Sequence, residues 1–257
     1  MTIPYGGIKM KENKYDDNTF FEKYSQMSRS QQGLSGAGEW EILKKLLPDF
    51  KGKRVLDLGC GYGWHCIYAM ENGASSVVGI DISHKMLEVA KEKTHFQEVE
   101  YRCCTIEDVD LPAESFDIIL SSLAFHYIEA YEDLINNLYK MLKPNGTLVF
   151  TVEHPVFTAY GTQDWHYNDN GEILHFPVDN YYYEGKRTAV FLGEKVIKYH
   201  RTLTTYLNTL LTNGFIINRV VEPQPPENMM DIPGMKDEMR RPMMLIVSAN
   251  KKGDIQN

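Results

Sequence analysis

A glycine-rich segment that follows a short apolar strand carries the strongest chemical signal in the chain. Residues 54–63 have the sequence RVLDLGCGYG, with Asp57 two positions before the first of three glycines, Gly59, Gly61 and Gly63. Glycine lets the backbone turn sharply and lets a ligand approach closely, because there is no Cβ in the way. A strand that runs into such a turn and then into a helix is typical of a nucleotide-cofactor site.

The spacing of the glycines narrows the kind of cofactor. Dinucleotide sites usually have the pattern G-x-G-x-x-G, whereas this chain has G-x-G-x-G and Trp64 at the third glycine position of the dinucleotide pattern. A carboxylate about 20 residues beyond the first glycine usually binds ribose hydroxyls, and Asp81 stands at about that distance from Gly59. The alternative role for Asp81 is to cap the next helix, which Ser83 can do instead.

Strand and helix patterns alternate through the first 152 residues. Strands are expected at 54–58, 76–80, 100–104, 116–121 and 147–152, and helices at 39–47, 63–72, 83–93 and 131–142. This alternation is typical of a parallel sheet with helices on both faces.

The rest of the chain differs from this pattern. A helix at 202–213 precedes two strands, 215–221 and 242–249, which we expect to pair antiparallel at the edge of the sheet. Between the halves, residues 154–200 lack a helical period and are rich in aromatic residues, which indicates an insertion. Tyr181, Tyr182 and Tyr183 are expected either to line a substrate pocket or to form an edge hairpin packed on the sheet.

The glycine turn, the acidic strand end at Asp81, the segment 116–119 (FDII) and the segment 142–146 (LKPNG) together resemble the class I S-adenosylmethionine-dependent methyltransferases. Over residues 50–152 the resemblance is to the small-molecule branch called methyltransferase type 11. It implies an α/β fold with a Rossmann-like seven-stranded sheet, mostly parallel with an antiparallel last strand. We therefore expect three parts: an N-terminal lid segment (1–35), a methyltransferase core (36–153 and 201–250), and the aromatic-rich insertion (154–200) as a lid or cap over the substrate.

The same resemblance implies S-adenosylmethionine as cofactor and S-adenosylhomocysteine as product. It places the cofactor against the strand ends, where Asp57 is expected to accept N–H groups of the glycine turn and to face the cofactor's amino group. At Thr105 many relatives carry an aspartate, and Ile106 and Met86 could equally be core residues. The implied contacts are Asp57, Gly59, Cys60, Gly61, Asp81, Ile82, Met86, Thr105, Ile106, Glu107, Ser121 and Leu123.

Methyl transfer from a sulfonium depends chiefly on aligning the nucleophile, so a general base is optional. His126 and His154 follow the fourth and fifth strands and are the catalytic candidates, although each could be a structural histidine. The acceptor is expected among the aromatic insertion and the N-terminal residues Tyr24, Met27 and Arg29. The methionines before the last strand (Met229, Met230, Met235 and Met239) are further candidates.

Composition limits the partners. The 257 residues carry a net charge of −8 with scattered basic residues, which disfavours nucleic acid, and no apolar run is long enough to span a membrane. The four cysteines contain no C-x-x-C pair, so we expect no metal. We expect a cytoplasmic enzyme, a monomer or homodimer, that methylates a small molecule. The alternatives are a cofactor-binding protein without turnover, a NAD-dependent oxidoreductase, or an enzyme that modifies a macromolecule.

Overall fold

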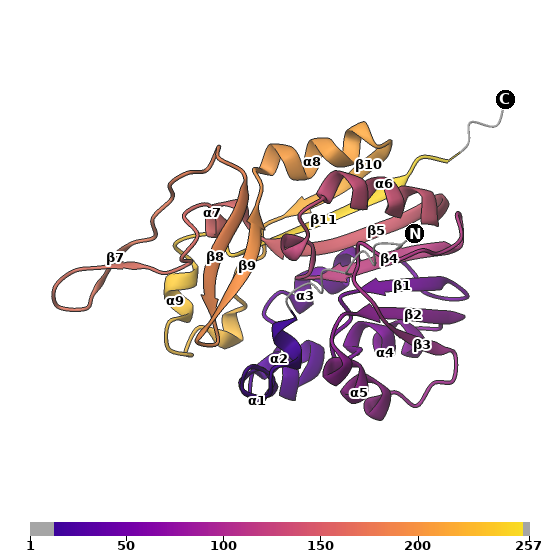
Figure 1. Ribbon diagram of the computed structural model, residues 1–257, viewed down its shortest axis with the longest axis horizontal. Helices are drawn as coiled ribbons and strands as arrows, with labels where there is room; N and C mark the ends of the chain where they lie inside the picture. The colour runs from indigo at the N-terminus through magenta and orange to yellow at the C-terminus, as the bar shows by residue number, and fades with distance from the viewer. Residues whose placement is uncertain (1–12, 254–257) are drawn as a thin grey trace, which may run out of the picture.

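A computed structural model describes residues 13–253 of the chain (Figure 1). Its main sheet has seven strands in the order β10-β11-β5-β4-β1-β2-β3. All neighbouring pairs are parallel except those of β11, which is antiparallel to both β5 and β10. The strands are β1 (Arg54–Leu58), β2 (Ser76–Asp81), β3 (Val99–Cys103), β4 (Phe116–Ser122), β5 (Leu142–Glu153), β10 (Phe215–Val221) and β11 (Met244–Lys251). The predicted mostly parallel sheet with an antiparallel last strand is confirmed.

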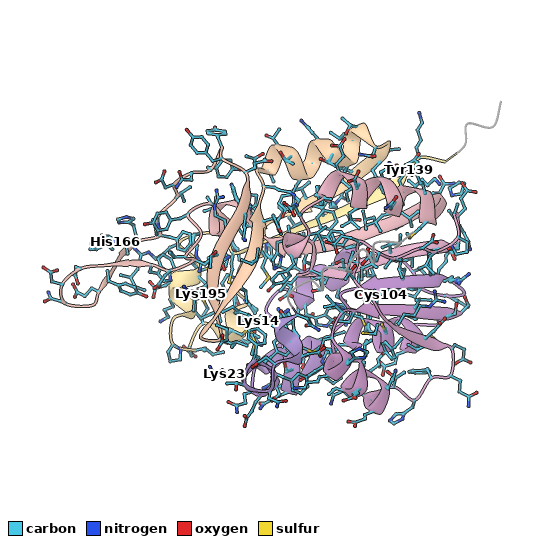
Figure 2. All side chains as sticks on the ribbon, viewed as in Figure 1. Lys14, Lys23, Cys104, Tyr139, His166 and Lys195 are labelled. Atoms are coloured by element: carbon cyan, nitrogen blue, oxygen red, sulfur yellow. The ribbon has the colours of Figure 1, made fainter. Side chains whose placement is uncertain are left out.

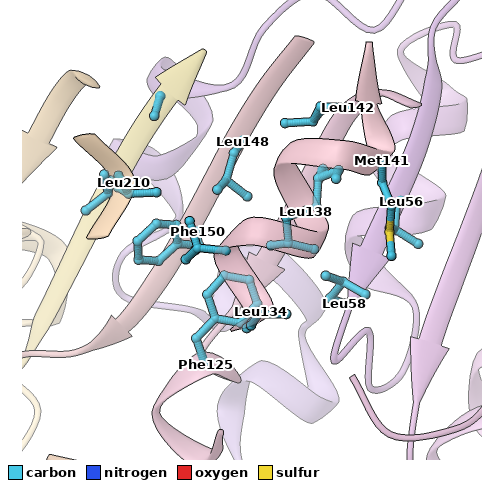
Figure 3. Close-up of a cluster of buried hydrophobic side chains, with 14 of the residues drawn as sticks. Leu56, Leu58, Phe125, Leu134, Leu138, Met141, Leu142, Leu148, Phe150 and Leu210 are labelled. Atoms are coloured by element: carbon cyan, nitrogen blue, oxygen red, sulfur yellow. The ribbon is translucent and has the colours of Figure 1, made fainter. Parts of the chain in front are cut away.

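Helices cover both faces of this sheet, because its central strands are apolar on both sides. In β1, Leu56 and Leu58 belong to one buried cluster and Val55 to the other, as the period of two in a strand requires. One face packs against α6 (Tyr131–Met141) and α8 (Leu203–Thr212). Figure 3 shows Leu134, Leu138 and Met141 of α6 among the side chains of this cluster. The other face packs against α3 (Trp40–Leu43), α4 (Trp64–Glu71) and α5 (His84–Lys93).

The insertion consists of a short helix and two hairpins. These are α7 (Pro155–Thr158), the pair β6 (His166–Tyr167) and β7 (Ile173–His175), and the longer pair β8 (Gly185–Phe191) and β9 (Glu194–His200). The β6–β7 hairpin extends away from the main sheet in Figure 1, and His166 is labelled on it in Figure 2.

The tyrosine run corrects one expectation. Tyr182 and Tyr183 precede β8 and are 87% and 76% exposed. The three tyrosines belong neither to a hairpin strand nor to the lining of the cavity described below, because the turn before β8 directs Tyr182 and Tyr183 to solvent.

The N-terminal segment contacts both the insertion and the core. It contains η1 (Lys14–Asp16), α1 (Asn18–Ser25), α2 (Ser28–Gln31) and η2 (Gly33–Gly36), and residues 1–12 of the predicted lid lie outside the described part. Phe20 packs with Ala189 and Val196 of the β8–β9 hairpin, and Lys23 Nζ donates to the carbonyl of Leu192 at 3.0 Å. Lys23 and Lys195 mark these two elements in Figure 2.

The remaining short helices are η3 (Lys44–Leu46), η4 (Phe125–Tyr127), η5 (Glu227–Met229) and α9 (Met235–Glu238). The last two lie between β10 and β11, where the sequence predicts only a loop. Among residues 13–253, no helix is both long enough and apolar enough to cross a bilayer.

Candidate cofactor and acceptor site

A cavity of about 1630 Å³ lies where the strands of the parallel sheet end. Its lining comes from the glycine turn, the ends of β2, β4 and β5, the N-terminal segment, the insertion and residues 223–244. Ligand cavities usually have volumes of about 300–1,000 Å³. The cavity therefore has room for two ligands side by side.

The glycine turn is fixed to the end of β2 by backbone and side-chain hydrogen bonds. The N–H groups of Gly59 and Cys60 donate to the carbonyl of Ile80 at 2.8 and 2.9 Å, and the Gly61 N–H donates to Asp81 Oδ2 at 2.8 Å. Gly61 lines the cavity, and a Cβ on it would meet no atom within 4 Å. Its missing side chain leaves space for a ligand at the backbone.

Asp81 connects this turn to helix α5. Its Oδ1 accepts the Ser83 N–H at 2.9 Å, while the Ser83 hydroxyl caps α5 by accepting the Met86 N–H at 3.1 Å. Ser83 therefore caps the helix, which the sequence left open as a role for either Ser83 or Asp81. Asp81 holds the turn and lines the cavity. Burial raises the pKa of the Asp81 carboxyl, and hydrogen bonds from Ser83 and Gly61 oppose this rise.

Asp57 does not organise the glycine turn, contrary to expectation. The N–H groups of the turn donate to Ile80, Asp81 and the carbonyl of Cys60. Asp57 Oδ2 instead accepts a hydrogen bond from Cys66 Sγ at 3.3 Å, and Oδ1 is buried without a partner. The side chain alternates to the face covered by α4, which takes it away from the turn. Burial raises the pKa of Asp57 to about 7, with the nearby Asp81 carboxylate contributing.

The other expected cofactor residues divide into two groups. Ile82, Met86, Thr105, Ile106, Glu107 and Leu123 line the cavity together with Gly59, Gly61 and Asp81. Cys60 and Ser121 are buried outside the lining, and the Ser121 hydroxyl donates to the carbonyl of Leu58 at 2.8 Å. Its neighbour Ser122 lines the cavity instead, since adjacent strand residues face opposite sides.

Leu123 has a backbone conformation that is rare for a leucine. Its φ is +54°, and its N–H donates to the carbonyl of Thr151 at 2.9 Å, which holds the end of β4 against β5. Such strain concentrates at functional sites, where the surrounding structure maintains it. Leu123 lines the cavity.

The structure separates the two candidate histidines. His126 lines the cavity, whereas His154 lies outside its lining, with Nδ1 accepting the Val156 N–H and Nε2 2.8 Å from Glu222. His154 therefore caps α7 and holds Glu222, so its geometry favours the structural alternative. His126 Nδ1 accepts the Glu153 N–H at 3.3 Å, and burial lowers the pKa of His126 to about 4.

Three further cavity residues were missed from the sequence. Lys198 Nζ lies 2.5 Å from Glu153 Oε1 and donates to Gln163 Oε1 at 2.8 Å, while Gln163 Nε2 donates to Glu153 Oε2 at 2.6 Å. We call Glu153, Gln163 and Lys198 the polar cluster. Its members come from β5, the loop before β6, and β9, so no motif links them; the adjacency of Glu153 to His154 was the only available signal.

The N-terminal segment contributes a second buried ion pair. Arg29 Nη2 lies 2.9 and 3.0 Å from the two carboxylate oxygens of Glu39, and both residues line the cavity with Tyr24 and Met27. Of the four methionines in question, Met229 and Met235 line the cavity. In the described part of the chain, no group of three or more His, Cys, Asp or Glu side chains could hold a metal ion.

Comparison with known proteins decides the family. Residues 56–150 match the family model of a methyltransferase domain. A structure assigned as an S-adenosylmethionine-dependent methyltransferase from Listeria monocytogenes is 55% identical, with a TM-score of 0.82 over 86% of this chain and 99% of that one. The chain belongs to the S-adenosylmethionine-dependent methyltransferases.

Two further methyltransferases are similar to this chain. A methyltransferase of the family from Mesorhizobium loti is 40% identical, with a TM-score of 0.79 over 85% of this chain and 100% of that one. A ubiquinone biosynthesis O-methyltransferase of Bradyrhizobium diazoefficiens is 39% identical over 101 residues, which is 38% of this chain and 39% of that one. The second likeness covers only about two fifths of each protein.

The residues of the cavity fit S-adenosylmethionine. Gly61 leaves its backbone open, Asp81 brings a carboxylate to the end of β2, and Ile106 and Met86 supply apolar contacts. Arg29 supplies a cation, since a guanidinium has five N–H donors and the contacts to Glu39 use only Nη2. When bound, the cofactor supplies an electrophilic methyl group.

We expect Gly61→Ala to lose mainly cofactor affinity and Gly63→Ala to lose mainly stability. A Cβ at Gly61 enters open cavity space, so the variant should lose cofactor affinity at least tenfold, with about 1 kcal/mol of backbone strain at φ +53°. A Cβ at Gly63 would lie 2.1 Å from the Tyr101 hydroxyl oxygen and should cost about 3 kcal/mol or more of stability. Calorimetric titration with S-adenosylhomocysteine and urea denaturation would measure both. Equal stability losses would contradict this division.

Asp57→Asn should change how stability depends on pH. The folded pKa of about 7 lies above the ordinary 3.8, so the stability that comes from the neutral carboxyl is complete below pH 4 and is lost as pH rises through 7. The loss is at most about 4 kcal/mol. Relative to wild type, Asp57→Asn should therefore gain stability at pH 8 and little at pH 4 in urea denaturation. A constant difference between pH 4 and pH 8 would contradict the assignment.

Arg29→Met should weaken binding of ligands that carry the methionine carboxylate. Because Arg29 lines the cavity and would donate a charge-assisted hydrogen bond to that carboxylate, we expect affinity for S-adenosylhomocysteine to fall about tenfold or more. Affinity for 5′-methylthioadenosine, which lacks that carboxylate, should change little. Arg102→Met removes an exposed arginine that pairs with Glu100 and is the matched control. Equal losses for both ligands would show that Arg29 only supports the fold.

Proposed function

We propose that the protein transfers a methyl group from S-adenosylmethionine to an oxygen atom of a small-molecule acceptor by in-line displacement. The observation that carries this proposal is the continuity of the cavity, which runs from Gly61 and Asp81 to the polar cluster under the insertion. The donor occupies the glycine-turn end in this proposal, and the acceptor occupies the other end. Both ligands then share one enclosure at the ends of the strands.

The N-terminal segment acts as a lid and the insertion as a cap. Their mutual contact through Phe20, Ala189 and Val196 supports this assignment, because it joins them beside the cavity that both line. Such an enclosure would orient the acceptor and exclude water, and orientation alone supplies roughly 7–11 kcal/mol of barrier reduction. An enclosed site on a chain of net charge −8 also favours a small acceptor over a nucleic acid.

An oxygen acceptor is favoured by relatives and by the cavity. The relatives from Enterobacter lignolyticus and Bradyrhizobium diazoefficiens are named as O-methyltransferases, although their likeness covers only 43% and 38% of this chain. The acceptor end contains hydrogen-bonding groups suited to a hydroxyl, namely His126, Tyr127 and Glu153.

Incubation with methyl-labelled S-adenosylmethionine and a metabolite extract tests the proposal. We expect label in a small-molecule fraction as an ether or ester, and calorimetric binding of S-adenosylmethionine but not of NAD. Asp81→Asn should reduce both signals together and serves as the control. Binding without any labelled product would favour a cofactor-binding protein without turnover, and label in protein or RNA would contradict a small-molecule acceptor.

A further inference from the structure

The polar cluster is a costly feature that the cofactor end of the cavity does not explain. The side chain of Lys198 is 3% exposed and that of Glu153 is 15% exposed. A buried ion pair rarely stabilises a protein more than apolar residues of the same shape would. Because Glu153, Gln163 and Lys198 all line the cavity, a role toward a ligand accounts for them better than stability does.

The ionisation of Glu153 is set by its neighbours. Burial alone would raise the pKa of the Glu153 carboxyl, but the charge of Lys198 and the hydrogen bonds from Lys198 and Gln163, together with the charge of His126 below its own pKa of about 4, lower it overall. The carboxylate is thus an acceptor of hydrogen bonds at neutral pH. Each carboxylate oxygen has two lone pairs, and the hydrogen bonds from Gln163 and Lys198 use one on each oxygen.

His126 presents a donor beside this carboxylate. Its Nδ1 accepts the backbone N–H of Glu153, so Nδ1 carries no proton. Because burial lowers its pKa to about 4, the neutral ring carries its proton on Nε2 at pH 7. His126 is therefore a hydrogen-bond donor to the cavity, and this tautomer removes it as a general base.

The walls around these groups are largely apolar. They come from the β8–β9 hairpin and from the segment between β10 and β11, which is rich in proline and methionine. The apolar lining residues include Val190, Phe191, Val196, Pro225, Met229 and Met243. A ligand that fills this end must bury an apolar body while it satisfies one donor and one acceptor.

We propose that Glu153 and His126 recognise the methyl acceptor as a phenol-like hydroxyl on an apolar body, Glu153 accepting the O–H and His126 Nε2 donating to the oxygen. This inference rests on the proposed function and adds the substrate class and two residue roles. As the O–CH3 bond forms and the S–CH3 bond breaks, the hydroxyl proton passes to the Glu153 carboxylate and the sulfonium becomes a neutral thioether. The oxygen becomes strongly acidic as it gains the methyl group, so a weakly basic carboxylate suffices.

Calorimetry on the protein loaded with S-adenosylhomocysteine tests this class without turnover. The probes are 4-butylphenol and its methyl ether 4-butylanisole, which differ only in the hydroxyl proton that Glu153 would accept. We expect the phenol to bind at least tenfold more tightly than the ether. Glu153→Gln should lower the affinity for the phenol at least tenfold, because only the phenol donates a hydrogen bond to the carboxylate. The affinity for the ether should stay within twofold of the wild-type value.

Glu129→Gln is the matched control. Glu129 also lines the cavity but lies outside the polar cluster, so the affinity of this variant for the phenol should stay within twofold of the wild-type value. Glu153→Gln leaves the Lys198 ammonium group buried without its ion-pair partner, so the double variant Glu153→Gln/Lys198→Met is tested as well. The affinity of each variant for S-adenosylhomocysteine reports whether it is folded.

Three results would overturn the inference: equal binding of phenol and ether to wild type, no binding of either, or equal losses in Glu129→Gln and Glu153→Gln. The wild-type comparison decides even if both Glu153 variants unfold. Failure of wild type to bind S-adenosylhomocysteine would instead contradict the proposed function, which separates the two failures.

Discussion

The hydrogen bond from the Gly61 N–H to the Asp81 carboxylate is the contact on which the cofactor end depends. It ties the turn after β1 to the end of β2, and the second oxygen of Asp81 holds the first residues of α5 through Ser83. The Ser83 hydroxyl in turn donates to Asp16, so the N-terminal segment is attached at the same point. The turn and the start of the helix therefore share the Asp81 carboxylate, and the N-terminal segment is attached to it through Ser83, so a change at Asp81 would reach all three.

The cofactor half was predictable because its rules are local. Glycines at fixed spacing and an acid at the next strand end follow from how parallel strands meet at one edge of a sheet, and the sheet itself follows from alternating apolar patterns. The prediction for Asp57 was wrong in its contacts, since the turn amides had nearer acceptors in Ile80 and Asp81. The spacing in the sequence does not show whether the Asp57 or the Asp81 carboxylate accepts a given N–H group of the turn.

The acceptor half could not be predicted in the same way. Glu153, Gln163 and Lys198 are brought together by the packing of the insertion on β5, and their positions in the sequence show no periodic relation. Aromatic density pointed to the insertion, and Phe157, Trp165, Tyr167 and Phe191 of that stretch line the cavity, whereas Tyr182 and Tyr183 face solvent. Apolar members of the β8–β9 hairpin, such as Val190 and Val196, line the cavity beside them.

The two ends of the cavity use buried charge differently. At the cofactor end, both carboxylate oxygens of Asp81 accept hydrogen bonds from backbone amides, and these bonds fix the turn before any ligand binds. At the acceptor end, Glu153 is fixed by side chains from two parts of the insertion, so its orientation exists only when the insertion packs on the core. Cofactor affinity should therefore depend on the sheet, and acceptor recognition on the docking of residues 154–200. An insertion of different sequence on the same sheet would keep the methyl donor and change the acceptor.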